Sequence, residues 1–188
     1  MRSGAAIFLM ISTVWVWASC SSEQKPDLSD VDVEINFSRF ERSLSSFKGD
    51  IDSSGLEQLR AQYGDFVDVF ARNIMSMSPE SDSMLALQLS HFMSDSSVSE
   101  VFSLVEESYS DTGDLEADLK KFFRYYIYYY PEARIPHIVT YVSAFNYGVV
   151  ISDSTMGIGL DMFLGQEEPY YPMIGIPQYL FRRFAKPY

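Results

Sequence analysis

Three observations predict an α+β fold that is predominantly helical and carries a small antiparallel sheet. Between residues 37 and 130, apolar residues recur at intervals of three and four, the period of an amphipathic helix. Two later segments, 137–145 and 147–152, are rich in valine, isoleucine, threonine and tyrosine, which favour strands. The chain has 188 residues and is 47% hydrophobic, which is sufficient for one domain with its own core.

The charge balance and the scarcity of metal ligands argue against several classes of function. The chain has 26 acidic and 14 basic residues and a net charge of −12, so a broad basic surface for nucleic acid is not expected. Its single cysteine excludes an intrachain disulfide, and its two histidines are too few for most all-histidine zinc sites. We therefore expect no nucleic-acid partner, no metal and no cofactor.

Residues 1–19 resemble the signal peptide of a bacterial lipoprotein. Arg2 supplies a positive start, residues 5–17 are apolar, and two small residues precede Cys20, the only cysteine. Cleavage between Ser19 and Cys20 would leave Cys20 as a triacylated N-terminus that anchors the chain in the cell envelope. An ordinary secretory signal is the alternative, because Trp17 stands where lipoprotein signals usually carry an aliphatic residue.

Residues 20–32 are predicted to form a polar tether, and residues 33–188 a single α+β domain. The tether contains Pro26 and four acidic residues, a composition typical of a solvated segment. No later segment approaches the 18 uninterrupted apolar residues of a membrane-spanning helix. The lipid on Cys20 is therefore the expected contact with the membrane, and either envelope membrane could hold it.

The domain begins with a change of period. Residues 31–36 alternate apolar and polar side chains, which predicts a short half-buried strand. Residues 37–47 then follow the helical period, which places Arg39, Glu41 and Arg42 on the outward face of a first helix.

Four further helices are predicted before residue 131. The first begins at Ser54, a capping residue, and continues to about residue 75. The next two cover residues 84–93 and 97–109, and Asp95 or Ser96 caps the second of them. The last covers residues 114–130 and ends at Pro131.

Six residues at the end of that last helix, 125–130, include five tyrosines. Such a cluster could stack on a ligand such as a sugar ring. The favoured interpretation is structural, because tyrosines at a helix end bury their rings and keep their hydroxyls in water.

The remainder of the chain is predicted to supply the sheet. Residues 137–145 and 147–152 form the two strands of a hairpin. Residues 154–164 form a strand or turn that leads into a short helix closed by Gly165. Pro177 then begins a final helical turn.

Charge is distributed unevenly along the chain. Residues 21–118 contain 21 acidic and 6 basic residues, whereas residues 119–188 contain 5 acidic and 7 basic residues. The favoured interpretation of the acidic half is a solvated helical face, and an electrostatic docking surface is the alternative.

No motif for catalysis is found, and no catalytic residue is predicted. The sequence lacks HExxH, GxSxG, P-loop and GxGxxG patterns, and His91 and His137 are interpreted as ordinary packed or surface residues. Asp161 is the one candidate polar centre, because it lies among apolar residues and a buried carboxylate needs a partner or a shifted pKa. The alternative for Asp161 is a helix cap or a bond to the preceding turn.

Several segments together resemble the gliding-motility lipoprotein GldB family of the Bacteroidetes. The most specific are Leu160 to Gly165 and Ile176 to Arg183. The matching segments are Cys20, Arg39-Phe40-Glu41, Gln62-Tyr63-Gly64-Asp65-Phe66, Tyr130-Pro131, Ile135-Pro136, residues 139–145, Gly159-Leu160-Asp161-Met162-Phe163-Leu164-Gly165, and Ile176-Pro177-Gln178-Tyr179 with Arg182-Arg183.

The resemblance implies an envelope lipoprotein that supports gliding motility, with an envelope protein of the gliding machinery as partner and no established catalytic activity. It also implies a distant similarity to zinc-metallopeptidase-like domains, whose metal-binding helix would lie near Asp161. Because the histidines are missing, the scaffold would be metal-free. The family continues past the point that matches Arg183 to Tyr188, so the resemblance predicts that a helical C-terminal part is missing.

Three hypotheses follow, in order of preference. The first is a lipid-anchored, non-enzymatic interaction component of gliding motility. The second is a zinc-hydrolase-like enzyme whose site is completed by a missing C-terminal part. The third is a carbohydrate-binding envelope lipoprotein that uses the tyrosines of residues 125–130.

Overall fold

The computed structural model describes residues 26–152 and 154–184. The chain divides into two units, Met1–Asp32 and Val33–Tyr188. In the described part of the first unit, the amide of Val31 bonds to the carbonyl of Leu28 at 3.0 Å and closes a turn. Cys20 and Ser19, the predicted lipidation and cleavage residues, lie outside the described residues.

The second unit is α+β, as predicted, but its sheet is mixed. The strands are β1 (Phe37–Arg39), β2 (His137–Tyr141), β3 (Val149–Ile151) and β4 (Thr155–Gly159). Their spatial order is β1-β2-β4-β3, in which β1, β2 and β4 run parallel and β3 pairs antiparallel with β4. The expected antiparallel sheet is therefore corrected.

The hairpin predicted for residues 137–145 and 147–152 is wrong, because these two strands do not pair with each other. The two strands exist, but β4 lies between β2 and β3, so the hairpin joins β3 to β4. Four of the five residues of β2 are buried, which is typical of a central strand covered on both faces. The exposed β3 takes the edge position instead.

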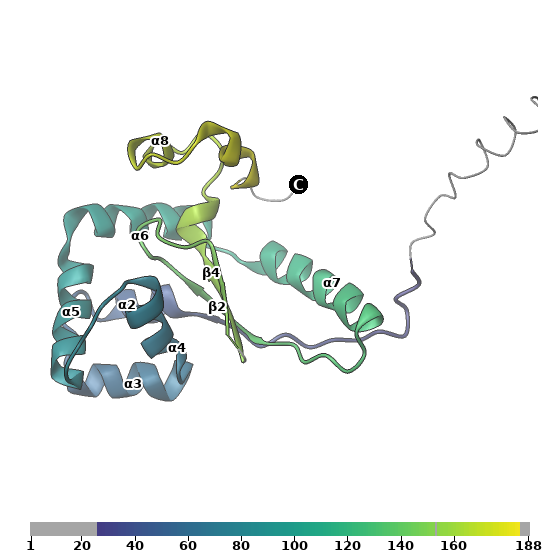
Figure 1. The fold of residues 1–188 in the computed structure, drawn as a ribbon, viewed down its shortest axis with the longest axis horizontal. Helices are drawn as coiled ribbons and strands as arrows, with labels where there is room; N and C mark the ends of the chain where they lie inside the picture. The colour runs from purple at the N-terminus through teal and green to yellow at the C-terminus, as the bar shows by residue number, and fades with distance from the viewer. Residues whose placement is uncertain (1–25, 153, 185–188) are drawn as a thin grey trace, which may run out of the picture. The chain divides into compact units, whose positions relative to one another are not determined.

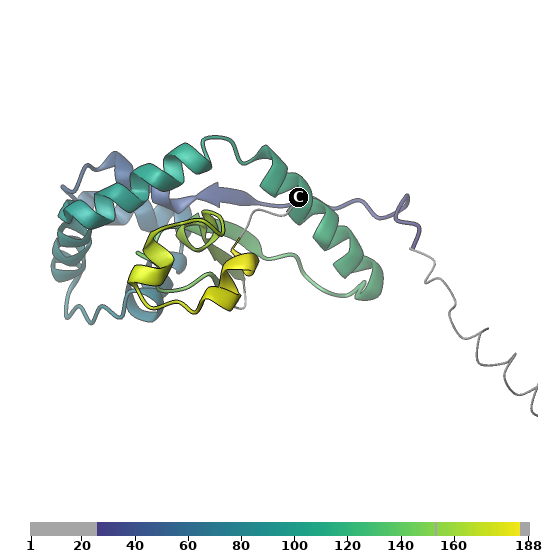
Figure 2. The ribbon, with the colours of Figure 1, turned by 90° about the horizontal axis from the view of Figure 1, so that it is seen from above.

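Seven helical segments follow β1, and the last of them, α7, completes the crossover to β2. Parallel strands require such a crossover connection. The segments are α2 (Phe40–Ser46), α3 (Ser53–Tyr63), α4 (Phe66–Asp68), the π-helical η1 (Val69–Ile74), α5 (Asp82–Ser94), α6 (Ser96–Ser108) and α7 (Gly113–Tyr129). Figures 1 and 2 show α2 to α5 on one side of the sheet and α7 extending away on the other.

Three helix boundaries differ from the expected ones. Residues 37–39 pair with β2 and are a strand instead of the first helical turn, and residues 31–36 precede the sheet. The carboxylate of Asp52 accepts the amide of Gly55 at 2.8 Å, so Asp52 caps α3 in place of Ser54. The long helix predicted to residue 75 is interrupted at Gly64, whose φ of +56° favours glycine.

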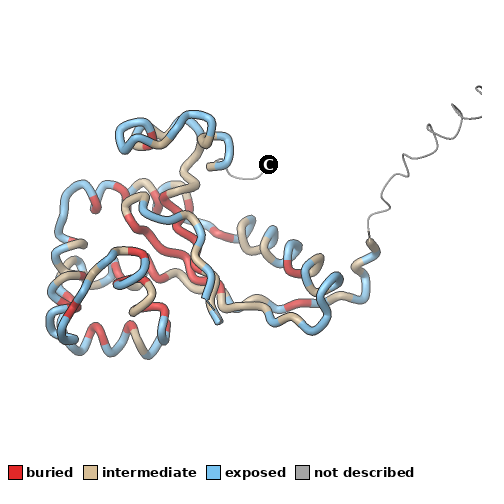
Figure 3. The backbone as a smooth tube through the Cα atoms, viewed as in Figure 1, coloured by how far each residue is buried: buried red, intermediate tan, exposed pale blue. Residues whose placement is uncertain are grey.

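The core lies between the sheet and the inner faces of α2 to α6. Phe40, which is fully buried, packs against the rings of Tyr63, Phe66 and Phe70 at centroid distances of 5.1, 5.4 and 4.9 Å. Figure 3 shows the buried residues concentrated along the strands and on these helix faces. Aromatic pairs at such distances add to the free energy gained from burial alone.

Three short helical segments end the described chain: η2 (Leu160–Phe163), α8 (Tyr170–Met173) and η3 (Gln178–Arg183). The short helix before Gly165 and the turn after Pro177 are confirmed. Helix α8 was not predicted, because a four-residue helix shows no period in the sequence.

Candidate functional site

Asp161 lies in a buried polar centre where β4 passes into η2. Its side chain is completely buried. Oδ2 accepts hydrogen bonds from the amide of Phe145 at 2.6 Å and the amide of Ser143 at 3.1 Å. The carboxylate therefore joins η2 to the loop that follows β2.

That loop has an unusual backbone that explains why it needs a carboxylate. Ala144 and Phe145 have φ values of 53° and 66°, a region that costs free energy for residues with a Cβ atom. The hydroxyl of Ser143 accepts the amides of Asn146 at 3.1 Å and Tyr147 at 3.3 Å. Together, Ser143 and Asp161 satisfy the amides that this conformation turns inward.

The electrostatics of Asp161 are those of a poorly compensated buried acid. Burial raises its pKa to about 6, and the hydrogen bonds from the amides of Phe145 and Ser143 oppose that rise. Among the described residues, its second oxygen, Oδ1, has no hydrogen-bond partner. Gly159, two residues before Asp161, allows the chain to pass close to Tyr147, because a Cβ atom at position 159 would overlap the carbonyl oxygen of Tyr147.

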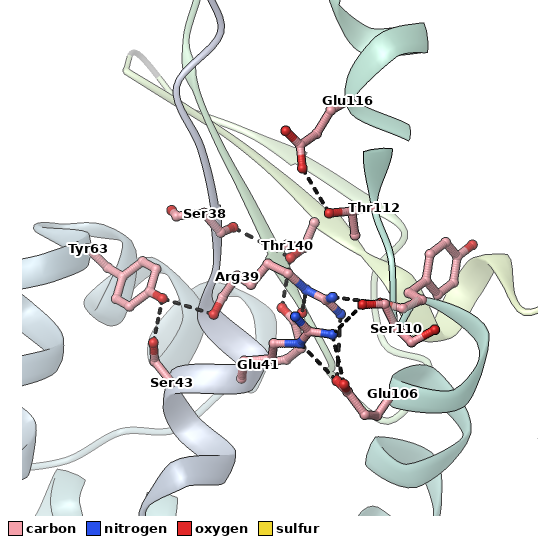
Figure 4. A network of polar contacts seen from close by, with 12 residues as sticks. Ser38, Arg39, Glu41, Ser43, Tyr63, Glu106, Ser110, Thr112, Glu116 and Thr140 are labelled. Atoms are coloured by element: carbon pink, nitrogen blue, oxygen red, sulfur yellow. Dashed lines mark hydrogen bonds and ion pairs between the residues drawn. The ribbon is translucent and has the colours of Figure 1, made fainter. Parts of the chain in front are cut away.

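A second polar centre joins β1, α2, β2 and α6, and Figure 4 shows it from close by. Nε of Arg39 donates to Oε1 of Glu41 at 2.5 Å, and the hydroxyl of Thr140 donates to Oε2 at 2.8 Å. Nη1 of Arg39 donates to the carbonyl of Tyr109, at the end of α6, at 2.6 Å. Only 3% of the Glu41 side chain and 11% of the Arg39 side chain are exposed.

The outward position predicted for Arg39 and Glu41 is therefore wrong. The helical period of α2 places Glu41 on the face opposite its apolar residues, but the sheet and α6 cover that face of this short helix. Arg42 does face outward, and its guanidinium makes two bonds to Glu106, at 2.7 and 2.9 Å. The sequence shows Arg39 and Glu41 close together, but it does not show that β2 supplies Thr140 as a third partner.

A family described as gliding motility protein GldB matches residues 21–188. The chain belongs to the GldB family. Membership implies a gliding-motility lipoprotein. Searches of curated proteins and of solved structures give no match.

Two of the GldB-family segments on which the resemblance depended contribute to these two centres. Arg39-Phe40-Glu41 supplies the second centre, and residues 159–165 contain Asp161 of the first. Along residues 26–152 and 154–184, no helix is long and apolar enough to cross a membrane.

Neither histidine of this GldB-family chain takes part in the hydrogen bonds of Asp161 and Glu41 described above. Nε2 of His137 is 2.7 Å from the hydroxyl of Ser38, and burial lowers the pKa of the ring. His91 is exposed on α5. In the described ranges, no group of three or more histidine, cysteine, aspartate and glutamate residues is placed to hold a metal ion.

Proposed function

We propose that this GldB-family chain is a lipid-anchored envelope protein that acts in the gliding machinery as a non-enzymatic interaction component. Family membership supports the link to gliding and to lipoproteins. The sequence up to Cys20 supports an acylated N-terminus as the contact with the membrane. The partner in this proposal is another envelope protein of the same machinery.

The observation that carries the non-enzymatic role is the use of the two buried carboxylates. Asp161 is wholly buried and accepts amides of the loop after β2. Glu41 is 3% exposed and accepts from Arg39 and Thr140. A catalytic acid or base must reach a substrate within hydrogen-bond distance. Both groups instead join parts of the fold, as structural polar centres do.

The variant Asp161→Asn tests this role, because asparagine keeps an oxygen that accepts the amides of Phe145 and Ser143 but loses the charge. Gliding is measured after complementation of a strain that lacks the chain. We expect gliding close to the wild-type rate at equal protein level. Abolished gliding at a normal protein level would contradict the proposal and favour an acid, base or ligand role.

Two further measurements test the anchor and the partner. The intact mass of the mature protein purified from membranes should correspond to a chain that starts at a triacylated Cys20. Mild crosslinking in membranes should recover an envelope protein whose own removal also stops gliding. Stoichiometric zinc in that preparation, or crosslinking that recovers no such protein, would count against an interaction component.

A further inference from the structure

Helix α7 leaves many of its apolar side chains exposed to water. It has 17 residues, and Phe123 is the only buried one. In Figure 3 the helix is otherwise coloured as exposed or half-buried. The exposed aromatic residues at its carboxyl end are Phe122, Tyr126, Tyr128, Tyr129 and Tyr130, with 54, 36, 44, 61 and 62% of their surface accessible.

Three of these rings form a continuous stripe. Phe122, Tyr126 and Tyr130 are spaced by four residues, so they lie on neighbouring turns of one helix face. The ring centroids are 6.3 Å apart for the first pair, which is stacked, and 5.4 Å apart for the second. Exposed apolar patches mark surfaces that meet a protein or a membrane. Tyrosine suits a boundary with water, because its ring is apolar and its hydroxyl is polar.

The same stretch is basic in an acidic protein. Lys120, Lys121 and Arg124 lie between residues 119 and 131, and no acidic residue does. Residues 21–118 carry 21 acidic and 6 basic residues, so the other end of the chain is strongly negative. An anionic surface attracts the end of α7 and repels the acidic helices. Basic residues beside exposed aromatic rings are typical of helices that lie on a lipid surface.

The tether joins the domain at Val33, which leads into β1. Fully extended, a tether of residues 20–32 spans at most about 45 Å. A lipid on Cys20 would therefore keep the domain within reach of the bilayer, at a high effective concentration.

We propose that the carboxyl-terminal half of α7, residues 120–130, lies against the anionic headgroup surface of the bilayer that holds Cys20. The aromatic stripe enters the headgroup region, and the exposed Lys121 meets lipid phosphates. This contact orients the domain so that α5 and α6 face away from the membrane. The proposal relies on the anchor at Cys20 for proximity to the bilayer.

The chain offers a specific probe for this contact. Both of its tryptophans, Trp15 and Trp17, precede Cys20, so the acylated mature protein contains none. Tyr129→Trp introduces a single reporter on α7. Leu87→Trp is the matched control, because Leu87 is 49% exposed on α5, at the opposite side of the domain in Figures 1 and 2.

The acylated proteins are reconstituted into phosphatidylethanolamine vesicles with or without phosphatidylglycerol, and quenching by brominated lipid is measured. We expect the Tyr129→Trp reporter to be quenched and its emission to shift to shorter wavelength in the anionic vesicles, while the Leu87→Trp reporter remains unquenched. Added salt should reverse the change, since it screens the charges. Equal quenching of the two reporters would overturn the proposal.

A charge reversal tests the electrostatic part. In the Tyr129→Trp background, Lys121→Glu should lower the ratio of docked to free domain about fivefold or more, because each basic residue near an anionic surface contributes a comparable attraction. Lys48→Glu removes one exposed positive charge near α2 and should leave quenching unchanged. Quenching that is insensitive to Lys121→Glu and to anionic lipid would contradict the role of charge.

The remaining outcomes separate this inference from the proposed function. Acylated protein whose reporter on α7 is unquenched overturns the inference and leaves the anchor intact. Protein without acylation contradicts the anchor, and its reporter, tested with the same vesicles, still decides whether α7 binds lipid. Shielding of the reporter in native envelope membranes but not in lipid vesicles would show that a protein covers α7, which overturns the lipid surface.

Discussion

Helices α6 and α7 follow each other in the chain and are similarly amphipathic, but they are used differently. Helix α6 buries four apolar residues, Val98, Val101, Phe102 and Val105. Helix α7 is longer and buries only Phe123. The helical period determines which side chains share a face, whereas neighbouring elements determine whether that face is buried. An unburied face of this kind is a candidate for contact with something outside the domain.

The polar contacts of α6 show how it is fixed to the domain. The carbonyl of Tyr109, at its end, accepts Nη1 of Arg39, and the hydroxyl of Tyr109 donates to the carbonyl of Phe163 in η2 at 2.5 Å. Burial raises the pKa of Tyr109 to about 12, so the hydroxyl stays protonated and able to donate. These contacts join α6 to the Arg39–Glu41 centre and to η2.

The largest loss of stability is expected for Glu41→Ala. It leaves the guanidinium of Arg39 buried without its carboxylate and removes the acceptor of Thr140. Removing one partner of a buried ion pair costs about 3–5 kcal/mol. Urea unfolding followed by circular dichroism measures this free energy. Arg42→Ala is the control, because its pair with Glu106 is exposed and should contribute about 1 kcal/mol or less. Equal losses for both variants would contradict the assigned difference in burial.

The next largest effect contrasts the two helices directly. Phe102→Ala on α6 removes a ring that is 8% exposed and should lower the free energy of unfolding by about 3 kcal/mol. Phe122→Ala on α7 removes a ring that is 54% exposed and should lower it by less than about 1 kcal/mol. A large loss for Phe122→Ala would show that the stripe stabilises the isolated domain, which argues against an external partner for it.

The pH dependence of the free energy of unfolding should distinguish the buried carboxyl of Asp161 from an exposed carboxylate. The pKa of Asp161 is about 6 in the folded protein, against 3.8 for an unperturbed aspartate. Between these values the folded state holds more protons than the unfolded state. The contribution of Asp161 to the free energy of unfolding is therefore fully present below pH 4. It falls by about 3 kcal/mol as the pH rises to about 6.

Urea unfolding of the wild type and of Asp161→Asn between pH 4 and pH 7 measures this contribution as a difference. The stability advantage of the wild type should shrink as the pH rises. Asp82→Asn is the control, because the hydrogen bond from Arg60 lowers the pKa of the exposed Asp82 below 3.8, so its contribution should stay nearly constant across this range. A wild-type advantage that stays constant across this range would contradict the raised pKa of Asp161.

Much of the helical part of the fold could be predicted from local sequence. The cap of α6 at Asp95 and the end of α7 before Pro131 depend on neighbouring residues only, and both are confirmed. The order of the strands could not be predicted in this way. The chain leaves β2 through Ala144 and Phe145, whose left-handed backbone is not marked by a glycine in the sequence, and β4 takes the place beside β2 that the sequence assigned to β3.

The candidate polar centre could be predicted in part. The apolar neighbours of Asp161 indicated burial, and the structure places the residue in a buried centre. Its partners are backbone amides of Ser143 and Phe145, which carry no signature in the sequence. The centre at Glu41 was missed, because its burial depends on Thr140, 99 positions later in the chain.

The smallest expected effect concerns how the two helices begin. The carboxylate of Asp95 accepts the amides of Ser97 at 2.8 Å and Val98 at 3.2 Å, so Asp95→Ala should lower the free energy of unfolding by about 1 kcal/mol.

The residue at the same position of α7, Thr112, makes no side-chain cap; its hydroxyl donates to Glu116 at 2.8 Å instead. Thr112→Ala should therefore cost less than Asp95→Ala in the same urea unfolding measurement. A greater loss for Thr112→Ala would mean that the start of α7 is fixed to the domain more firmly than that of α6. A firmly fixed α7 could still present its aromatic carboxyl end to a bilayer, but its orientation would then be set by the domain.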